Sequence, residues 1–193
     1  MTQPIVTTVL FARKDSAYKN YKFFDVYDAD RDARTYHGNN PVIAHPPCRA
    51  WGQLSHLANP RVDEKQLAWY ALSQVRLCGG VLEHPKRSRL WKESGILSCE
   101  VDAFGGYLIF IDQFHFGHVA SKPTGLYICG VPRNKLPPVP VRNGKPWKTI
   151  CGVVGQPGRR CTQYEREYTP LLLMKWLREV TKLCYLNRKE RFG

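Results

Sequence analysis

Short apolar runs separated by polar turns recur along most of the chain. The runs are rich in β-branched and aromatic residues, as is typical of buried strands. The predicted strands are Ile5–Phe11, Phe23–Tyr27, Val42–Ala44, Val81–Leu82, Tyr107–Asp112 and Leu126–Val131. Polar turns bound each run, so the pattern predicts several short strands of one sheet.

Two helical patterns accompany these strands. Leu67, Ala71 and Val75 recur at four-residue spacing and predict a helix over Glu64–Leu77, with Asp63 as its N-cap. Gly79-Gly80 is expected to end this helix.

The second pattern follows Thr169-Pro170, where proline suits the first position of a helix. Its apolar stripe is Leu173, Leu177, Val180 and Cys184. Weaker signals predict short helical turns over Ala17–Tyr21 and over Arg31–Tyr36, the latter capped by Asp30.

Strands that alternate with helices predict an α/β fold, with a mostly parallel, Rossmann-like sheet and flanking helices. A chain of 193 residues has the length of one compact domain. Residues 132–160 are rich in Pro, Gly, Lys and Arg and show little periodicity, so we expect an extended basic loop or a small insertion there.

Charge and cysteine content narrow the class of protein. The net charge of +13 favours a polyanionic partner such as nucleic acid, although a merely basic protein would have the same composition. The seven cysteines include no C-x-x-C pair, and no secretory signal or membrane-length apolar run is present. We therefore expect free thiols in a reducing cytoplasm. Cys151 and Cys161 lack the spacing of a zinc finger, so no metal site is predicted.

The main candidate for chemistry is Cys48. The apolar run Val42–Ala44 is followed by Pro46-Pro47, which cannot extend a sheet ladder, and then by this thiol. Glu83-His84-Pro85 follows the next apolar run in the same way. Ligands bind at the carboxyl ends of strands in open α/β sheets, so both positions are expected to face one site. The alternatives are a buried structural thiol and a carboxylate that only pairs with an arginine.

The order of these motifs resembles that of the DNA cytosine-5 methyltransferases. Pro46-Pro47-Cys48 resembles the nucleophile motif of that family, and Glu83-His84-Pro85 resembles its Glu-Asn-Val motif. Phe116–Thr124, with the strand after it, resembles the Tyr-Gly-x-Pro-Gln-x-Arg-x-Arg segment, and Asp25–Tyr36 resembles the second-strand motif. The resemblance extends over residues 5–185 and implies a compact, phage-type, methyltransferase-like protein.

The resemblance also implies roles for individual residues. Cys48 would add as a thiolate to C6 of a pyrimidine base in DNA, and Glu83 would hydrogen-bond the ring. The base would be flipped from a duplex or come from a single strand. Residues implied in holding base or phosphate are Arg49, Trp51, His84, Arg87, Arg89, His118 and Lys122.

The cofactor implied is S-adenosylmethionine, with Asp15 and Asp28 as binding residues. However, the turn after the first strand, Phe11–Tyr18, contains no glycine, whereas the family has a Gly-rich turn there. Its Arg13 and Lys14 favour an anion instead.

Two other functions fit the same residues. The chain could be a catalytically inactive relative that binds DNA or acts against restriction. It could also act on a free pyrimidine nucleotide, with Arg13 and Lys14 holding the phosphate. Trp51 and His118 could then be residues of the scaffold.

Overall fold

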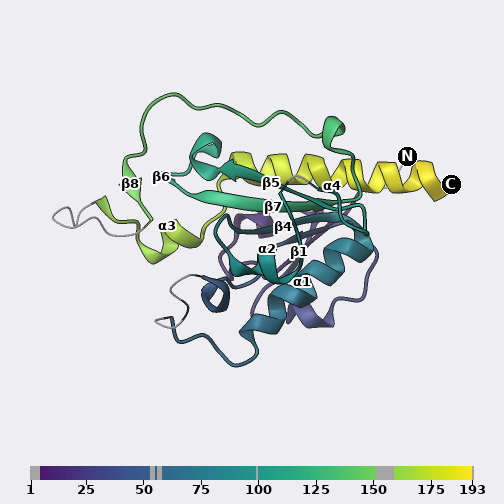
Figure 1. The fold of residues 1–193 in the computed structure, drawn as a ribbon, viewed down its shortest axis with the longest axis horizontal. Helices are drawn as coiled ribbons and strands as arrows, with labels where there is room; N and C mark the ends of the chain where they lie inside the picture. Colours follow the sequence, from purple (N-terminus) through teal and green to yellow (C-terminus); the bar gives the residue numbers. More distant parts are fainter. Residues whose placement is uncertain (1–4, 53–54, 56–57, 99, 151–158, 193) are drawn as a thin grey trace.

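Six strands form the central sheet, shown in Figure 1 in a computed structural model that describes residues 5–52, 55, 58–98, 100–150 and 159–192. The strand order is β2–β1–β3–β4–β7–β5. The bounds are β1 Thr7–Leu10, β2 Phe24–Tyr27, β3 Val42–Ala44, β4 Gly80–Pro85, β5 Tyr107–Asp112 and β7 Pro123–Cys129. Strands β2, β1, β3 and β4 are parallel, and β7 runs antiparallel to both β4 and β5. The α/β class and the mostly parallel sheet are therefore confirmed.

The two long helices cover opposite faces of this sheet. Helix α1 (Glu64–Cys78) lies on one face and α4 (Leu171–Phe192) on the other, as Figure 1 shows. Side chains alternate between the faces, as the two-residue period of a strand requires. In β3, Val42 packs into the cluster that includes α1, whereas Ile43 packs into the cluster that includes α4. The sheet is thus buried on both faces, which explains its continuous apolar runs.

The order in which strands are added to the sheet reverses at β1, and this reversal creates a place for a ligand. The chain passes from β1 to β2 on one side and then to β3 on the other side of β1. The loops that leave β1 and β3 therefore diverge at their carboxyl ends. A crevice at such a switch point is the usual binding site of an open α/β sheet.

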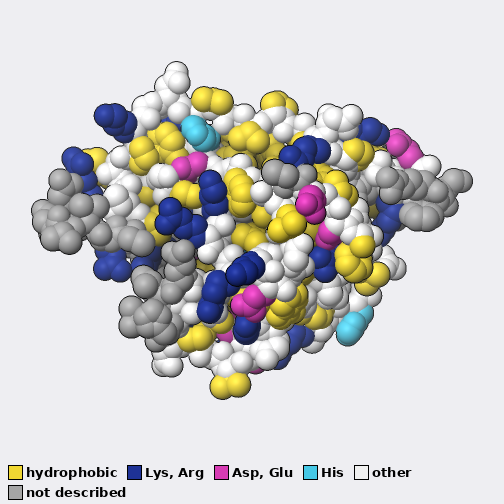
Figure 2. All heavy atoms as spheres, viewed as in Figure 1, with side chains coloured by type: hydrophobic (Ala, Val, Ile, Leu, Met, Phe, Trp, Pro, Cys, Tyr) yellow, Lys and Arg dark blue, Asp and Glu magenta, His cyan; other side chains and the backbone are white. Residues whose placement is uncertain are grey.

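A small second unit lies beside this crevice. Strands β6 (Ala120–Ser121) and β8 (Lys148–Thr149) pair in parallel, and helix α3 (Gln163–Glu167) follows them. Helix α3 begins with a capping box, because Thr162 Oγ1 accepts from Glu165 N at 3.2 Å and Thr162 N donates to Glu165 Oε2 at 2.8 Å. Figure 1 shows β6, β8 and α3 together at the left end of the molecule, and Figure 2 shows Lys and Arg side chains gathered on that half of the same face.

Most elements lie where the pattern predicts them, but two caps differ. Helix α1 ends at Cys78, and Gly79 follows as its C-cap with a φ of 75°, which favours glycine. Asp63 stands at the N-cap position without capping, because its backbone is already helical (φ −85°, ψ −8°) and not extended as capping requires. Its carboxylate pairs with Arg34 and Arg61. The predicted cap at Asp30 is wrong, since Asp32 caps a 3₁₀ turn over Ala33–Thr35.

Other differences concern short elements. The last predicted strand begins earlier than expected, at Pro123, and runs antiparallel. Helix α2 (Arg89–Glu93), capped by Ser88, and helix α3 were not predicted, because each is too short to show a helical period. The described part of residues 132–160 contains β8 and a 3₁₀ turn over Arg133–Lys135. Every helix in the described ranges is too short or too polar to cross a lipid bilayer.

Candidate active site

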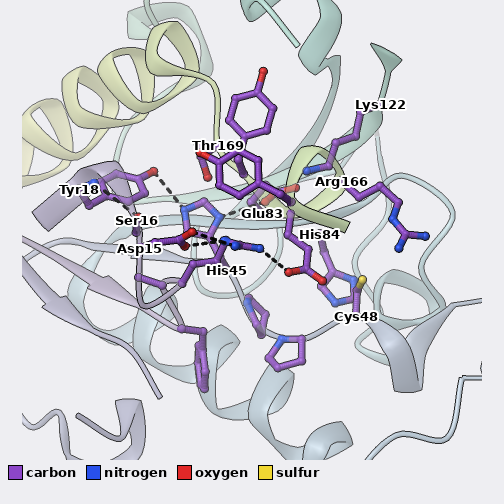
Figure 3. A pocket seen from close by; sticks show the side chains of 18 of the residues that line it. Asp15, Ser16, Tyr18, His45, Cys48, Glu83, His84, Lys122, Arg166 and Thr169 are labelled. Carbon is purple, nitrogen blue, oxygen red and sulfur yellow. Dashed lines mark hydrogen bonds and ion pairs between the residues drawn. The ribbon is translucent and has the colours of Figure 1, made fainter. Parts of the chain in front are cut away.

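A pocket of about 530 Å³ opens at the switch point of the sheet. Its walls come from the turn after β1, the loop after β3, the end of β4, the residue before β7, and helix α3 with the start of α4. The predicted residues that line it are Asp15, Cys48, Arg49, Glu83, His84 and Lys122. Figure 3 shows Cys48, Glu83 and Lys122 around the same space. The structure thus brings the two motifs at the strand ends together.

The loop that carries Cys48 is held in place by the backbone and by one arginine. The ladder continues past β3 through His45 N, which donates to Leu10 O at 3.0 Å, and then stops at the two prolines. Trp51 N donates to the Cys48 carbonyl at 3.0 Å and forms a 3₁₀ turn. Arg89 donates to Ala50 O at 3.1 Å. The thiol is therefore presented from a fixed loop.

Cys48 is exposed to the pocket, unlike the buried Cys78, Cys129, Cys161 and Cys184. Partial loss of hydration on the pocket wall and the negative charge of Glu83 raise the pKa of the Cys48 thiol, while Lys122 opposes them. The thiol is therefore mostly protonated at neutral pH in the free protein. A ligand that neutralises the charge of Glu83 would lower the pKa of this thiol.

Glu83 is the carboxylate at the centre of the pocket, with 14% of its side chain exposed. Its Oε2 is 3.0 Å from His45 Nδ1, and its Oε1 accepts from Gln113 Nε2 at 3.1 Å. Burial alone would raise the pKa of Glu83, but the charge of Lys122 and the hydrogen bond from His45 outweigh it and lower the pKa to about 2. Glu83 is therefore a fixed, ionised acceptor at neutral pH.

A hydrogen-bonded chain connects Glu83 to the turn after β1. His45 Nε2 is 3.1 Å from the hydroxyl of Tyr18, which also shares a hydrogen bond with the side chain of Thr169. The dashed lines in Figure 3 follow this chain from Tyr18 through His45 to Glu83. The chain spans three elements, so the orientation of Glu83 depends on all of them.

His84 lies behind this carboxylate with only 1% of its surface exposed. Its ring meets Trp91 edge to face, with 5.9 Å between the centroids. Burial lowers the pKa of His84 to about 4, although the charge of Glu83 and the backbone of Pro47 oppose this. The imidazole is therefore neutral at neutral pH and acts as a polar wall.

Two cations of the pocket carry no ion pair with any described residue. Lys122 is positioned through its backbone, because Asp112 Oδ1 accepts from Lys122 N at 2.8 Å. Arg166 comes from helix α3 and lines the same wall. Both appear in Figure 3 around the space in front of Cys48 and Glu83. These two side chains are available to an anionic or carbonyl-bearing ligand.

Arg49 also lines the pocket, but its guanidinium has a structural partner. It donates to both oxygens of Glu64, at 3.1 and 2.6 Å, and the Glu64 side chain is fully buried. Removal of Arg49 would leave a buried carboxylate without its main counter-ion.

The remaining predicted contacts to base or phosphate lie outside the pocket lining. Trp51 is fully buried and meets Trp69 edge to face. His118 is also fully buried, its Nε2 being 2.7 Å from Glu165 O. Arg87 is exposed, and Arg89 braces the Cys48 loop through Ala50. In this conformation Trp51 and His118 belong to the scaffold.

The expected cofactor side of the pocket is closely engaged by protein groups. Asp15 is paired with Arg13, whose Nε and Nη2 donate to it at 2.8 and 3.0 Å. Arg13 also pairs with Glu167 of α3 at 2.5 Å. Phe11, at the end of β1, has a φ of 61°, which is rare outside glycine and costs about 1 kcal/mol or more.

Asp28 lies outside the pocket lining and is 7% exposed. The Lys19 ammonium binds it, and its Oδ1 accepts from Asp30 N and Arg31 N. Lys19 and these backbone donors lower the pKa of Asp28 to about 2, against the effect of burial. Its oxygens therefore already have partners, and a ribose would have to displace Lys19.

Four functional residues are not among the predicted site residues. His45, Tyr18 and Gln113 build the network around Glu83, and Arg166 adds a cation. His45 could have been found, since it directly follows the β3 run as a polar residue at a strand end. The other three meet Glu83 or the pocket only through tertiary contacts.

No protein-family model and no curated protein matches the sequence. Among the described residues no group of three or more His, Cys, Asp or Glu could hold a metal ion, and Cys151 lies outside those residues. The chemistry of the pocket therefore has to indicate the function: an exposed thiol, a fixed carboxylate, and two cations that have no ion pair among the described residues.

Proposed function

We propose that the protein modifies a pyrimidine base of DNA through transient addition of Cys48 to C6 of the ring, as a methyltransferase-like transferase. The observation that carries this is the placement of Cys48 and Glu83 in one pocket, at the carboxyl ends of the adjacent strands β3 and β4. A pyrimidine becomes nucleophilic at C5 only after a nucleophile adds at C6. Cysteine is the side chain best suited to this step.

The fold supports the proposal at the level of architecture. Four parallel strands, a switch point between β1 and β3, and helices on both faces suit a Rossmann-like, methyltransferase-like core. The order of the motifs along the chain is then explained, because the fold brings them together at one edge of the sheet.

In this proposal one residue is the nucleophile, and two others orient the ring and stabilise the charge that develops on it. Cys48 loses its proton to solvent and adds to C6. Glu83 accepts a hydrogen bond from the polar edge of the ring and fixes its orientation. Lys122, whose charge acts on both Cys48 and Glu83, stabilises the thiolate and the negative charge that develops on the ring.

DNA as the partner is supported by the charge of the chain and by the form of the site. The net charge of +13 suits a polyphosphate, and Arg87 and Arg166 carry no ion pair with a described residue. The C6 atom of a base stacked in a duplex is out of reach of a thiol in a pocket, so a flipped or single-stranded base is the form we propose.

The resemblance implies S-adenosylmethionine as the cofactor, but the residues present do not fit it. The turn after β1 has Phe11 and Arg13 where close approach to a cofactor needs glycine, and Asp28 is occupied by Lys19. We therefore assign only the base-activating half of the reaction to this pocket.

A catalytically inactive, DNA-binding relative is the second candidate. The raised pKa of the Cys48 thiol favours it, because a protonated thiol is a poor nucleophile. An enzyme acting on free nucleotides is less well supported, since Arg13 already pairs with Asp15 and Glu167.

A trapping experiment separates these candidates. DNA containing 5-fluorocytosine or 5-fluorouracil is incubated with the protein, quenched with denaturant, and resolved as a slower-migrating covalent complex. The proposed enzyme forms this complex, and Cys48→Ala does not, although the variant still binds DNA. If the native protein binds both analogues without any covalent complex and does not exchange the C5 hydrogen of the unsubstituted base with solvent, the inactive binder is the correct assignment.

A further inference from the structure

We infer that the pocket takes a uracil-type base, a 4-oxopyrimidine, in preference to cytosine. This inference rests on the proposed function and assigns the substrate class of the same site. It departs from the methyltransferase resemblance, which implies cytosine. The groups that surround Glu83 carry the inference, because they decide which ring edge the carboxylate can meet.

Both oxygens of Glu83 already accept hydrogen bonds from the protein. His45 Nδ1 lies 3.0 Å from Oε2, and Gln113 Nε2 donates to Oε1 at 3.1 Å. Gln113 is itself fixed, since its Nε2 also donates to Thr124 Oγ1 at 3.1 Å. A carboxylate held between two donors is stabilised in its ionised form.

The other charged and titratable groups near Glu83 point the same way. Lys122 places a positive charge in the pocket, and the hydrogen bond from His45 acts in the same direction on the pKa of Glu83. His84, on the same strand, is buried and neutral at neutral pH. Tyr18 meets His45 rather than Glu83, and Cys48 carries a thiol with a raised pKa. None of these groups favours the protonated form of Glu83, so its carboxylate has no proton to donate.

An ionised carboxylate accepts hydrogen bonds and donates none. Uracil presents an N3–H donor between two carbonyl oxygens, so its N3–H can meet Glu83 while O4 meets a cation. Lys122 has no ion pair with a described residue and lines the same pocket. Among the charged groups, it lowers the pKa of Glu83 most. Cytosine presents an unprotonated N3 instead, and its lone pair would face the negative charge of Glu83.

The addition step balances for uracil without an acid. The Cys48 thiolate forms a bond to C6, and the electron pair of the C5–C6 double bond moves toward C4 and O4 as an enolate. The proton of the thiol has gone to solvent, N3 keeps its hydrogen, and the negative charge on O4 lies beside Lys122. The same step on cytosine puts charge on N3, which then needs a proton that Glu83 does not hold.

A binding experiment with a variant that lacks the thiol tests the preferred base independently of the covalent chemistry. Two single-stranded oligonucleotides, identical except for one central deoxyuridine or deoxycytidine, are titrated against Cys48→Ala protein. We expect the deoxyuridine strand to bind at least about tenfold more tightly, because a buried hydrogen-bonding group discriminates strongly against a mismatched edge. Glu83→Gln in the same background should narrow the ratio toward one, since an amide can pair with either ring.

The matching 5-fluoro strands are then compared in wild-type protein by the rate of covalent complex formation. Tighter binding of the deoxyuridine strand together with faster trapping of the fluorouracil strand supports the inference. Equal or preferential binding and trapping of cytosine overturns it and leaves the proposed function intact, with His45 as the candidate proton source. A binding preference for uracil with neither a covalent complex nor exchange of the C5 hydrogen leaves the base class standing and removes the thiol chemistry.

Discussion

The replacement Glu83→Gln tests whether Glu83 is held ionised by its surroundings. The substitution keeps the size of the side chain and removes its charge. In the folded protein Lys122, His45 and Gln113 all favour the carboxylate. In the unfolded chain the carboxylate is hydrated and has its ordinary pKa. Ionisation of Glu83 and folding are therefore linked.

The magnitude follows from the pKa of Glu83, which falls from 4.5 to about 2 on folding. At about 1.4 kcal/mol per pKa unit, the ionised group contributes about 3 kcal/mol to the free energy of unfolding. A lowered folded pKa means that the contribution is complete above the unfolded value, near pH 4.5, and is lost as the pH falls toward 2. About 1 kcal/mol of it should remain at pH 3.

Urea unfolding of wild type and Glu83→Gln at pH 7 and at pH 3 measures this linkage. We expect the stability advantage of wild type over the variant to shrink by about 2 kcal/mol between the two pH values. Glu179→Gln is the matched control, because Glu179 is 54% exposed and its ion pair with Lys182 contributes little. If the difference between wild type and Glu83→Gln is the same at both pH values, Glu83 is not held ionised and the choice of base inferred from it fails.

Three further outcomes are expected. Arg49→Ala should lower the free energy of unfolding by about 2 kcal/mol, because Glu64 is left buried without its counter-ion, and Arg49→Ala/Glu64→Gln should recover part of the loss; equal urea midpoints for the single and double variants would contradict this. S-adenosylmethionine should produce no thermal shift and no heat in calorimetry, because Lys19 holds Asp28; saturable binding would show that the turn after β1 opens for it. Affinity for single-stranded DNA should fall steeply as salt is raised, and Arg166→Gln and Arg87→Gln should each reduce the slope of log affinity against log salt by about one phosphate contact; a flat salt dependence would refute the polyanion assignment.

The sequence predicts the elements of the sheet better than their ends and caps. Apolar runs such as Val42–Ala44 are buried on both faces, so their composition indicates a strand directly. Asp30, Asp32 and Asp63 are equally good N-cap residues by type. The choice depends on the backbone conformation that the fold imposes: Asp32 is non-helical and caps, whereas Asp63 is already helical and does not.

The candidate site shows the same division. Cys48 and Glu83 can be predicted because each lies after an apolar run at the carboxyl end of a strand, and both strands end at one edge of the sheet. The roles of Arg49, Trp51 and His118 could not, since a basic or aromatic residue near the motif could face either the pocket or the scaffold. Glu64 lies fifteen residues after Arg49 and claims its guanidinium, and Trp51 turns into the core against Trp69.

Exchange of the C5 hydrogen of the base tests the central claim most directly, because it needs no group donor. Addition of Cys48 to C6 makes C5 nucleophilic, so C5 takes a proton from solvent before the thiol leaves again. A deoxyuridine- or deoxycytidine-containing strand incubated with the protein in deuterium oxide should gain deuterium at C5, as seen by mass spectrometry of the released nucleosides. Cys48→Ala should give none. Absence of exchange in both strands with native protein that binds them, or equal exchange with Cys48→Ala, would contradict thiol addition by Cys48.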